Sequence, residues 1–467
     1  MSLNVLIQFN SQLTEGIVDV IVNSDLVEAS EFVAETKPTT YFALSLYILT
    51  FVFLYLQAGK LKNNLSTPTF RTRVITLFLI LLPFIDMAGK GASARSFPLI
   101  AVKTVYAYSE EMASMQKLLA TRDKFQFNAS ISGIPKKETF IFIMGETSRR
   151  DYYSLYGYPR KTNPQLEKLD NLAIFKDVIA PANATVLSLM AILHLSTAED
   201  DSLFYKTKSI VSLAKEAGYK TWWLSAQSRY GQHETSVASS GIDSDVKQYL
   251  QGGRTLSRTY DTGLLPFFEE GLQDKKEKKF IVMHLYGSHI SYKKRYPEDF
   301  SIFNDTPPNY ENHSELIQER VNEYANSIAY TDFMVSEVIQ KVAAKNHAAC
   351  VIYTADHGEY LADNLDDDFM GHGRPEPYKV EVEVPLIVWC SPEYRQQNPQ
   401  KWQEILSQQK APISLEDMFY ALSDIMHIDY ALMKPERSFF NEKFIPNLPR
   451  KTRSSSSKVL YDYNQLK

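Results

Sequence analysis

The sequence predicts an α/β fold in which a mainly parallel sheet is flanked by helices on both faces, preceded by a short N-terminal helical membrane anchor. Two observations predict it. From residue 136 onward, continuous apolar runs alternate with helical patterns, as is typical of parallel strands buried on both faces. Upstream, 22 uncharged residues lie between Lys37 and Lys60. We therefore expect an acidic tail at 1–37, an anchor with two transmembrane helices at 38–90, a connector at 91–135 and a globular domain at 136–467.

Length and composition exclude several classes of protein. The 467 residues include 50 Lys and Arg against 55 Asp and Glu, so no large basic surface for nucleic acid is expected. A mean hydropathy of −0.26 excludes a polytopic transporter that fills most of the chain. The two cysteines, Cys350 and Cys390, are too few for a disulfide scaffold or an all-cysteine metal site. Because both lie in apolar runs, two buried free thiols are favoured over one bridge.

The N-terminal part predicts two membrane-spanning helices. The uncharged run at 38–59 matches the roughly 20 residues that cross about 30 Å of hydrocarbon. A second apolar run at 74–84 extends to residue 89 if Asp86 lies at the interface. A buried core helix is the alternative for this run, because it is short and contains Pro83. The loop between the runs has basic but no acidic residues, which places it in the cytoplasm and both flanks outside.

Three further features complete the organisation. No basic region followed by an apolar segment begins at Met1, so we expect no cleavable signal peptide. The connector includes a segment at 105–120 that can form a helix lying on the membrane or on the domain. The serine-rich segment RKTRSSSSK at 450–458 indicates a solvated loop or tail. The apolar runs of the domain predict strands at 139–144, 173–179, 220–225, 279–285, 348–354 and 384–390.

Polar residues follow three of these predicted strands directly. Glu146 comes after the first, His289 lies in the GSH motif after the fourth, and Asp356 with His357 follows the fifth. Ligands bind beyond the carboxyl ends of the strands in such sheets, so one pocket can collect all three motifs. Carboxylates and an imidazole suit zinc or another divalent ion. A loop aspartate that caps a helix beside a surface histidine is the better interpretation of one pair alone, but three motifs together favour the metal site.

Thr185, in the segment PANATVLSL, is the candidate nucleophile. Apolar residues recur at helical spacing from Leu187 onward, so Thr185 is expected in the first turn of a helix, where free N–H groups stabilise an anion. Metal coordination would lower the pKa of its hydroxyl and make it nucleophilic. A simple N-cap role for Thr185 is an equally good interpretation of this segment alone.

Five motifs together resemble one known family. They are GETSRRDYYSLYGYPRKTNP, PANATVLSL, HLYGSHISYKKRYP, EYANSIAYTDFMVSEVI and TADHGEYLADN followed by GHG. In order and approximate spacing they resemble the membrane-anchored phosphoethanolamine transferases of the alkaline phosphatase/sulfatase superfamily. The resemblance covers about 136–440. The acidic segment at 16–35 and the two spans after it also resemble the last part of the family's membrane domain, so the membrane part looks shortened.

The resemblance implies roles for particular residues. Four match the ligands of the family's catalytic zinc: Glu146, Thr185, Asp356 and His357. Thr185 also matches the residue that becomes phosphoethanolaminated. His289 and His372 match a pair of histidines that bind the phosphoryl group or a second zinc. The implied reaction is a double displacement, in which Thr185 attacks phosphatidylethanolamine, diacylglycerol leaves, and an acceptor then takes the group.

The resemblance also implies a location and partners. We expect a bacterial inner-membrane enzyme with a periplasmic catalytic domain, a zinc cofactor, phosphatidylethanolamine as donor, lipopolysaccharide as acceptor and no nucleic-acid partner. The HLYGSHISYKKRYP segment is more similar to the branch that modifies inner-core sugar than to the lipid A branch. Its residues Lys293, Lys294 and Arg295 suit an anionic acceptor or form an ordinary solvated patch. The alternatives are a sulfatase or phosphatase of the same fold, and an inactive membrane-tethered binding protein.

Overall fold

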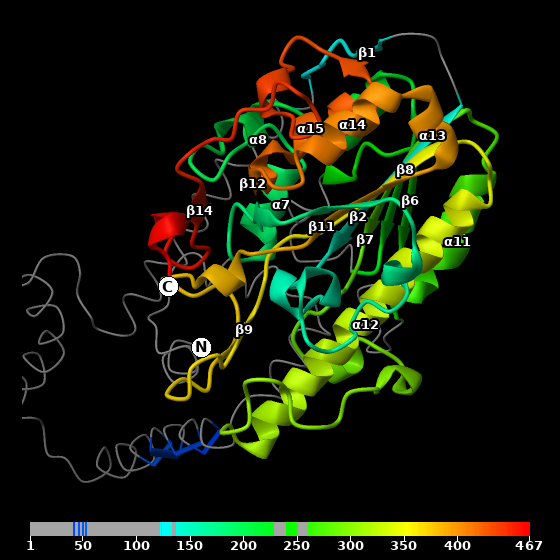
Figure 1. Cartoon of the computed structure of the whole chain (residues 1–467). Helices are drawn as coiled ribbons and strands as arrows, with labels where there is room; N and C mark the ends of the chain where they lie inside the picture. Colours follow the sequence, from blue (N-terminus) through cyan, green and yellow to red (C-terminus); the bar gives the residue numbers. More distant parts are fainter. Residues whose placement is uncertain are drawn as a thin grey trace, which may run out of the picture. The chain divides into compact units, whose positions relative to one another are not determined.

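A seven-stranded sheet forms the centre of the computed structural model of this chain (Figure 1). Its strands are β2 (Glu138–Gly145), β3 (Leu172–Phe175), β5 (Lys220–Ser225), β6 (Val246–Tyr249), β7 (Lys278–His284), β8 (Ala348–Ala355) and β11 (Leu386–Cys390). They lie in the order β3-β11-β8-β2-β7-β5-β6. β11 runs antiparallel to both β3 and β8, and the other neighbouring strands of this sheet are parallel. The mainly parallel sheet predicted from the apolar runs is therefore confirmed.

The structure describes residues 124–132, 137–227, 240–250 and 260–467, together with Arg122 and eight positions between 41 and 53. The described residues from Arg122 onward belong to one compact unit, and the positions between 41 and 53 belong to another.

Helices cover both faces of the sheet (Figure 1). Successive side chains of a strand point to opposite faces, so Phe140 and Phe142 of β2 enter one apolar cluster while Ile141 and Ile143 enter a second. The first cluster includes residues of α7 (Thr185–Ile192), α9 (Ile210–Glu216), α13 (Pro392–Gln397), α14 (Pro399–Ser407) and α15 (Met418–Ile425). The second includes residues of α11 (Leu265–Gln273) and α12 (Glu315–Ala343). The two-sided cover explains why β2 is apolar along its whole length.

The longest described helix is α12, and its sequence explains both its start and its orientation. The Ser314 hydroxyl accepts a hydrogen bond from the N–H of Ile317, which satisfies one free donor of the first turn. Buried residues recur at Val321, Ile328 and Val335, a spacing of seven that places them along one face of the helix. This face packs in the second cluster.

Smaller strand pairs accompany the sheet. They are β1 (Ser130–Ile131) with β13 (Ile428–Asp429), β4 (Asp177–Ile179) with β12 (Pro412–Ser414), β9 (Tyr360–Leu361) with β10 (Met370–Gly371), and β14 (Lys451–Arg453) with β15 (Leu460–Asp462). The short helix α8 (Ser202–Lys206) follows α7. The run at 173–179, predicted as one strand, is divided at Lys176 into β3 of the main sheet and β4, which pairs with β12.

The two cysteines form a disulfide, so the expectation of free thiols is wrong. Cys350 of β8 and Cys390 of β11 are directly paired residues of the antiparallel ladder, with their Cα atoms 4.1 Å apart. The apolar surroundings were predicted correctly, but the pairing depends on the register of two strands that are 40 residues apart in sequence.

The serine-rich segment 450–458 is not a solvated tail, which corrects that expectation. It begins with strand β14, and Ser454, Ser455 and Ser456 are buried. The Ser454 hydroxyl donates to the carbonyl of Arg374 over 3.0 Å. The Ser454 hydroxyl can be buried here because a main-chain carbonyl of a neighbouring loop accepts its hydrogen bond.

Little of the expected anchor lies within the described residues. The described positions between 41 and 53 are helical. Within the described ranges, no helix combines the length and hydropathy that a membrane crossing requires. The tail at 1–37, the second run at 74–89 and the segment at 105–120 lie outside the described residues and stay predictions. The end of the connector packs on the domain, because Phe127 lies in the first apolar cluster and β1 pairs with β13.

Candidate active site

The site lies where neighbouring parallel strands end. β2 lies beside β8, and its last residue, Gly145, pairs with Ala355 at the end of β8. Glu146 and Asp356 therefore leave the sheet side by side. The loop after β7 joins them, because the N–H of Ser288 donates to the Glu146 carbonyl over 2.9 Å.

Thr185 is the first residue of α7, and Ala184 is the N-cap, which corrects the interpretation of Thr185 as a simple cap. The Thr185 hydroxyl donates to Glu146 Oε1 over 3.0 Å and lies 3.3 Å from His357 Nε2. It therefore faces a carboxylate and an imidazole. One turn later, the Ser188 hydroxyl donates to the carbonyl of Asp356, which fastens α7 to the end of β8.

Glu146, Asp356 and His357 form a buried trio whose geometry resembles a metal-binding site. One ligand atom from each lies within 4.8 Å of the others. His357 Nε2 is 3.3 Å from Glu146 Oε1 and 3.4 Å from Asp356 Oδ2. His357 Nδ1 donates to the carbonyl of Gly358 over 2.8 Å, so Nε2 is the ring nitrogen that faces the two carboxylates.

The trio fits a divalent cation such as zinc. Asp356 Oδ2 is buried and has no hydrogen-bond partner among the described residues. A buried carboxylate oxygen without a partner is costly, and a cation at this position would satisfy it. One imidazole nitrogen with carboxylate and hydroxyl oxygens is also a donor set that zinc accepts.

The charges of the three groups depend on one another. Burial and the charge of Glu146 raise the pKa of Asp356 to about 8. Burial alone would raise the pKa of Glu146, but the hydrogen bond and charge of His357 hold it well below its usual value. Burial disfavours the charged His357, yet Asp356 and Glu146 raise its pKa to about 10. A cation that binds here therefore competes with protons.

His289 and His372 border the trio. The ring of His372 has its centroid 4.2 Å from that of His357 and 5.9 Å from that of His289. Glu359 is buried, and its Oε2 lies 2.7 Å from His372 Nδ1. This contact orients the His372 ring so that Nε2 is available for a ligand. Burial lowers the pKa of His289 well below its usual value. All six residues named from the sequence thus lie at one site.

Two residues that the motifs did not single out hold the carboxylates. The main-chain N–H of Thr147 donates to Asp356 Oδ1 over 3.0 Å, and the Thr147 hydroxyl donates to Glu146 Oε1 over 2.8 Å. Gln227 Nε2 donates to Glu146 Oε2 over 3.1 Å. Gln227 follows the end of β5, so the strand-end argument extended to that strand would have found it.

The predicted basic patch is divided in the structure. Lys293 and Lys294 are exposed, whereas Arg295 is buried. Arg295 Nε donates to the His289 carbonyl over 2.8 Å, and its guanidinium lies 4.4 Å from the centre of the Tyr286 ring. Arg295 therefore holds the loop that carries His289, and only the two lysines can contribute to a solvated surface.

Known proteins share this sequence and fold. The family model described as Sulfatase matches residues 138–428. The phosphoethanolamine transferase EptC of Escherichia coli strain K12 is 31% identical over 349 residues, which cover 73% of this chain and 60% of EptC. The Kdo(2)-lipid A phosphoethanolamine 7''-transferase of the same strain is 29% identical over 299 residues, covering 62% of this chain and 51% of that protein. The chain thus spans about three fifths of the length of EptC.

A solved structure extends the comparison to three dimensions. The crystal structure of the C-terminal periplasmic domain of EptC from Escherichia coli, a complex with Zn, matches with a TM-score of 0.68 at 29% identity. The match covers 73% of this chain and 96% of that domain. The family model spans the sheet and every site residue from Glu146 to His372. This chain therefore belongs to the sulfatase family.

Proposed function

We propose that this chain transfers phosphoethanolamine from phosphatidylethanolamine to lipopolysaccharide, at an inner-core sugar or lipid A, through an intermediate on Thr185. One observation carries the proposal: the Thr185 hydroxyl lies at the start of α7, 3.0 Å from Glu146 Oε1 and 3.3 Å from His357 Nε2. The similarity to two phosphoethanolamine transferases supports the choice of transferred group. The sulfatase alternative needs Cys or Ser followed by x-Pro-x-Arg, which the residues after Thr185 do not match.

In each half of the proposed reaction, one phosphorus–oxygen bond forms while another breaks. First, Thr185 Oγ1 bonds to the phosphorus of the donor while the bond to the diacylglycerol oxygen breaks. Glu146 Oε1, which already accepts the Thr185 hydrogen bond, orients this hydroxyl, and the proton of the hydroxyl ends on diacylglycerol. Then an acceptor oxygen displaces Thr185, which regains a proton.

The surrounding residues support this chemistry. A zinc ion held by Glu146, Thr185, Asp356 and His357 would lower the pKa of the Thr185 hydroxyl and offset negative charge on the phosphoryl oxygens. His289 and His372 bind the phosphoryl group or a second zinc ion. Glu359 keeps His372 oriented for either role through the 2.7 Å contact.

We further propose that the chain is anchored in the bacterial inner membrane, with the tail at 1–37 and the catalytic domain at 136–467 in the periplasm. The uncharged run at 38–59 and the basic loop after it support this orientation. The disulfide supports an oxidising compartment. Donor and acceptor are both membrane lipids, so an anchor keeps the site near its substrates.

The first test is mass spectrometry of lipopolysaccharide from cells that express the full chain or its Thr185→Ala variant. Lipid A and core oligosaccharide are analysed separately. Only the unchanged chain is expected to add phosphoethanolamine, because removal of the nucleophile reduces such reactions by at least about 1,000-fold. The modified fraction identifies the acceptor.

Thr185→Ser is the matched control, since it keeps a hydroxyl at the same position and is expected to retain part of the activity. An equal increment with Thr185→Ala would contradict the nucleophile. No increment in either fraction with the unchanged chain would contradict lipopolysaccharide as the acceptor and favour another envelope molecule.

A further inference from the structure

Asn183, two residues before the nucleophile, is fully buried and joins three separate segments. Its Nδ2 donates to the carbonyl of Arg374 over 3.0 Å and to Glu381 Oε1 over 3.1 Å. Its Oδ1 accepts a hydrogen bond from the N–H of Ser455 over 2.9 Å. The side chain thus uses both its amide nitrogen and its amide oxygen, which fixes its orientation.

Glu381 anchors this amide from the side of the loop that carries His372. The carboxylate is fully buried. Its Oε2 accepts from the N–H of Tyr378 over 2.8 Å, and its Oε1 accepts from the N–H of Arg374 over 3.3 Å. Because Arg374 follows His372 by two residues, one carboxylate holds the backbone next to His372 and the side chain of Asn183.

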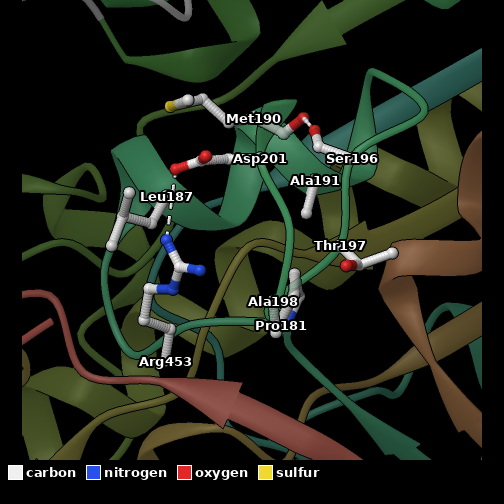
Figure 2. A pocket seen from close by; sticks show the side chains of 9 residues that line it. All are labelled: Pro181, Leu187, Met190, Ala191, Ser196, Thr197, Ala198, Asp201 and Arg453. Atoms are coloured by element: carbon white, nitrogen blue, oxygen red, sulfur yellow. Dashed lines mark hydrogen bonds and ion pairs between the residues drawn. The ribbon is translucent and has the colours of Figure 1, made fainter. Parts of the chain in front are cut away.

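The C-terminal hairpin of β14 and β15 provides the second anchor. The N–H of Arg453 donates to the Pro181 carbonyl over 2.9 Å, and the N–H of Asn183 donates to the Arg453 carbonyl over 3.4 Å. Figure 2 shows the Arg453 side chain beneath α7, paired with Asp201 at 3.1 Å in a small pocket that Leu187 also lines. The hairpin therefore contacts the nucleophile segment before Thr185, at Pro181 and Asn183, and Asp201 after α7.

Helix α7 has no side-chain cap of its own. Its N-cap is Ala184, which carries no hydrogen-bonding group in its side chain. The direction in which α7 starts, and with it the position of the Thr185 hydroxyl, is therefore set from outside the helix. Among the described residues, the side chain that links this start to the His372 loop is Asn183.

We propose that Asn183, anchored by Glu381 and by the C-terminal hairpin, is a positioning residue that sets Thr185 relative to His372. The proposal rests on the transfer function proposed above. Among the described residues, the Asn183 side chain bonds to Arg374, Glu381 and Ser455 and to none of the proposed metal ligands, so it acts through the backbone. A small displacement of a reacting group is enough to slow a reaction about 100-fold, so such a residue affects the rate more than binding.

The test measures release of diacylglycerol from labelled phosphatidylethanolamine by the full chain in detergent micelles, which reports the first half-reaction without an acceptor. Asn183→Asp places an acceptor against Glu381 Oε1 and the Arg374 carbonyl. Because no acceptor regenerates Thr185, each chain turns over once, and the assay measures a single-turnover rate constant. We expect this rate constant at saturating donor to fall about 10- to 100-fold, while the donor concentration that gives half the maximal rate changes by less than about threefold. Zinc content and the midpoint of thermal unfolding are measured on the same samples.

Rescue distinguishes positioning from general damage. In Asn183→Asp with Glu381→Gln, the new amide can donate to the new carboxylate, which restores the contact between these two side chains and removes the repulsion of two carboxylates, but not the contacts with the main chain of Arg374. We expect the double variant to react at least about fivefold faster than Asn183→Asp. Asn398→Asp, which makes the same change between α13 and α14, is the control and is expected to keep the unchanged rate.

Two outcomes would overturn the proposal: an unchanged single-turnover rate constant in Asn183→Asp, or a double variant no faster than the single one. If Asn183→Asp does not fold, Asn183→Ser gives the same test, since it removes the amide donors without adding charge; full activity there would equally overturn it. Thr185→Ala separates the two proposals. Activity in Thr185→Ala contradicts the transfer mechanism, whereas an inactive Thr185→Ala beside a fully active Asn183→Asp contradicts only the positioning role.

Discussion

The charges of the buried residues at this site depend on one another. Asp356 is buried, carries an Oδ2 without a partner among the described residues, and lies beside a second buried carboxylate, Glu146. Two adjacent buried carboxylates repel each other and lose their hydration, which destabilises the fold unless positive charge is close by. His357 supplies part of that charge, and a divalent cation would supply more.

Removal of one carboxylate is therefore expected to weaken metal binding. In Asp356→Asn, an anionic ligand becomes neutral, and we expect the affinity for zinc to fall by at least about 100-fold. Elemental analysis of the dialysed protein and competition with a chelator measure this. Asp305→Asn, at a carboxylate that is 76% exposed, is the control and is expected to keep the zinc content of the unchanged protein. Equal zinc content in Asp356→Asn would contradict the metal site.

At the scale of elements, α12 supports the segment that precedes β3. Asp332, in the middle of α12, is fully buried and accepts from the N–H groups of Gln165 and Leu166 over 2.9 and 3.0 Å. These donors lie at the start of a short 3₁₀ helix, Leu166–Lys168, so a side chain of α12 satisfies the first turn of another element.

Burial raises the pKa of Asp332 to about 7, although its two hydrogen bonds lower it. The unfolded chain releases this proton near pH 4, so between about pH 4 and 7 the folded state binds more protons than the unfolded state. The free energy of unfolding therefore decreases as pH rises through this range, and Asp332 accounts for at most about 3 kcal/mol between pH 5 and 8. In Asp332→Asn we expect a smaller difference in unfolding free energy between these two pH values.

Urea unfolding at pH 5 and pH 8 checks this expectation. Burial also raises the pKa of Glu381 and of Asp417 to about 7 and that of Asp356 to about 8, so Asp332 is one of several carboxyl groups that lower the unfolding free energy as pH rises. In Asp332→Asn, the decrease in unfolding free energy between pH 5 and pH 8 should become smaller only by the part that Asp332 contributes. A variant with the full decrease of the unchanged protein would show that Asp332 titrates as an ordinary exposed carboxyl.

At the scale of the whole domain, the disulfide links the neighbouring strands β8 and β11. The site residue Asp356 directly follows β8. The two cysteines are 40 residues apart in sequence, and the bridge between them closes the segment that carries His357 and His372. The chain-entropy model assigns about 4 kcal/mol to a closed loop of this length.

We expect the variant with Cys350→Ala and Cys390→Ala to lose about 2–4 kcal/mol of unfolding free energy, measured in urea without reductant. Alkylation of the unfolded, unreduced protein provides the matching control by mass. No added mass is expected before reduction, and two alkyl groups are expected after it. Two groups before reduction would show that the thiols are free.

The prediction of strands succeeded where burial is two-sided and failed where it is not. The runs at 139–144 and 348–354 became β2 and β8, whose residues are buried along their whole length. β6 was not predicted, because an edge strand with the sequence VKQY has no apolar run. The serine-rich segment was misinterpreted for a related reason: it is buried against a distant loop, where the Ser454 hydroxyl donates to the Arg374 carbonyl, and composition does not reveal such a contact.

The sequence by itself determined the class of fold and the residues that lie together at the proposed site. Apolar runs indicate strands, and the polar residues that follow them must lie at one edge of a parallel sheet, so Glu146, Asp356 and His357 were found without coordinates. Only the tertiary structure decided the disulfide between Cys350 and Cys390 and the contacts of Asn183, because both depend on register and on segments that meet from distant parts of the chain. Local patterns describe which residues are buried, whereas packing decides which of them touch.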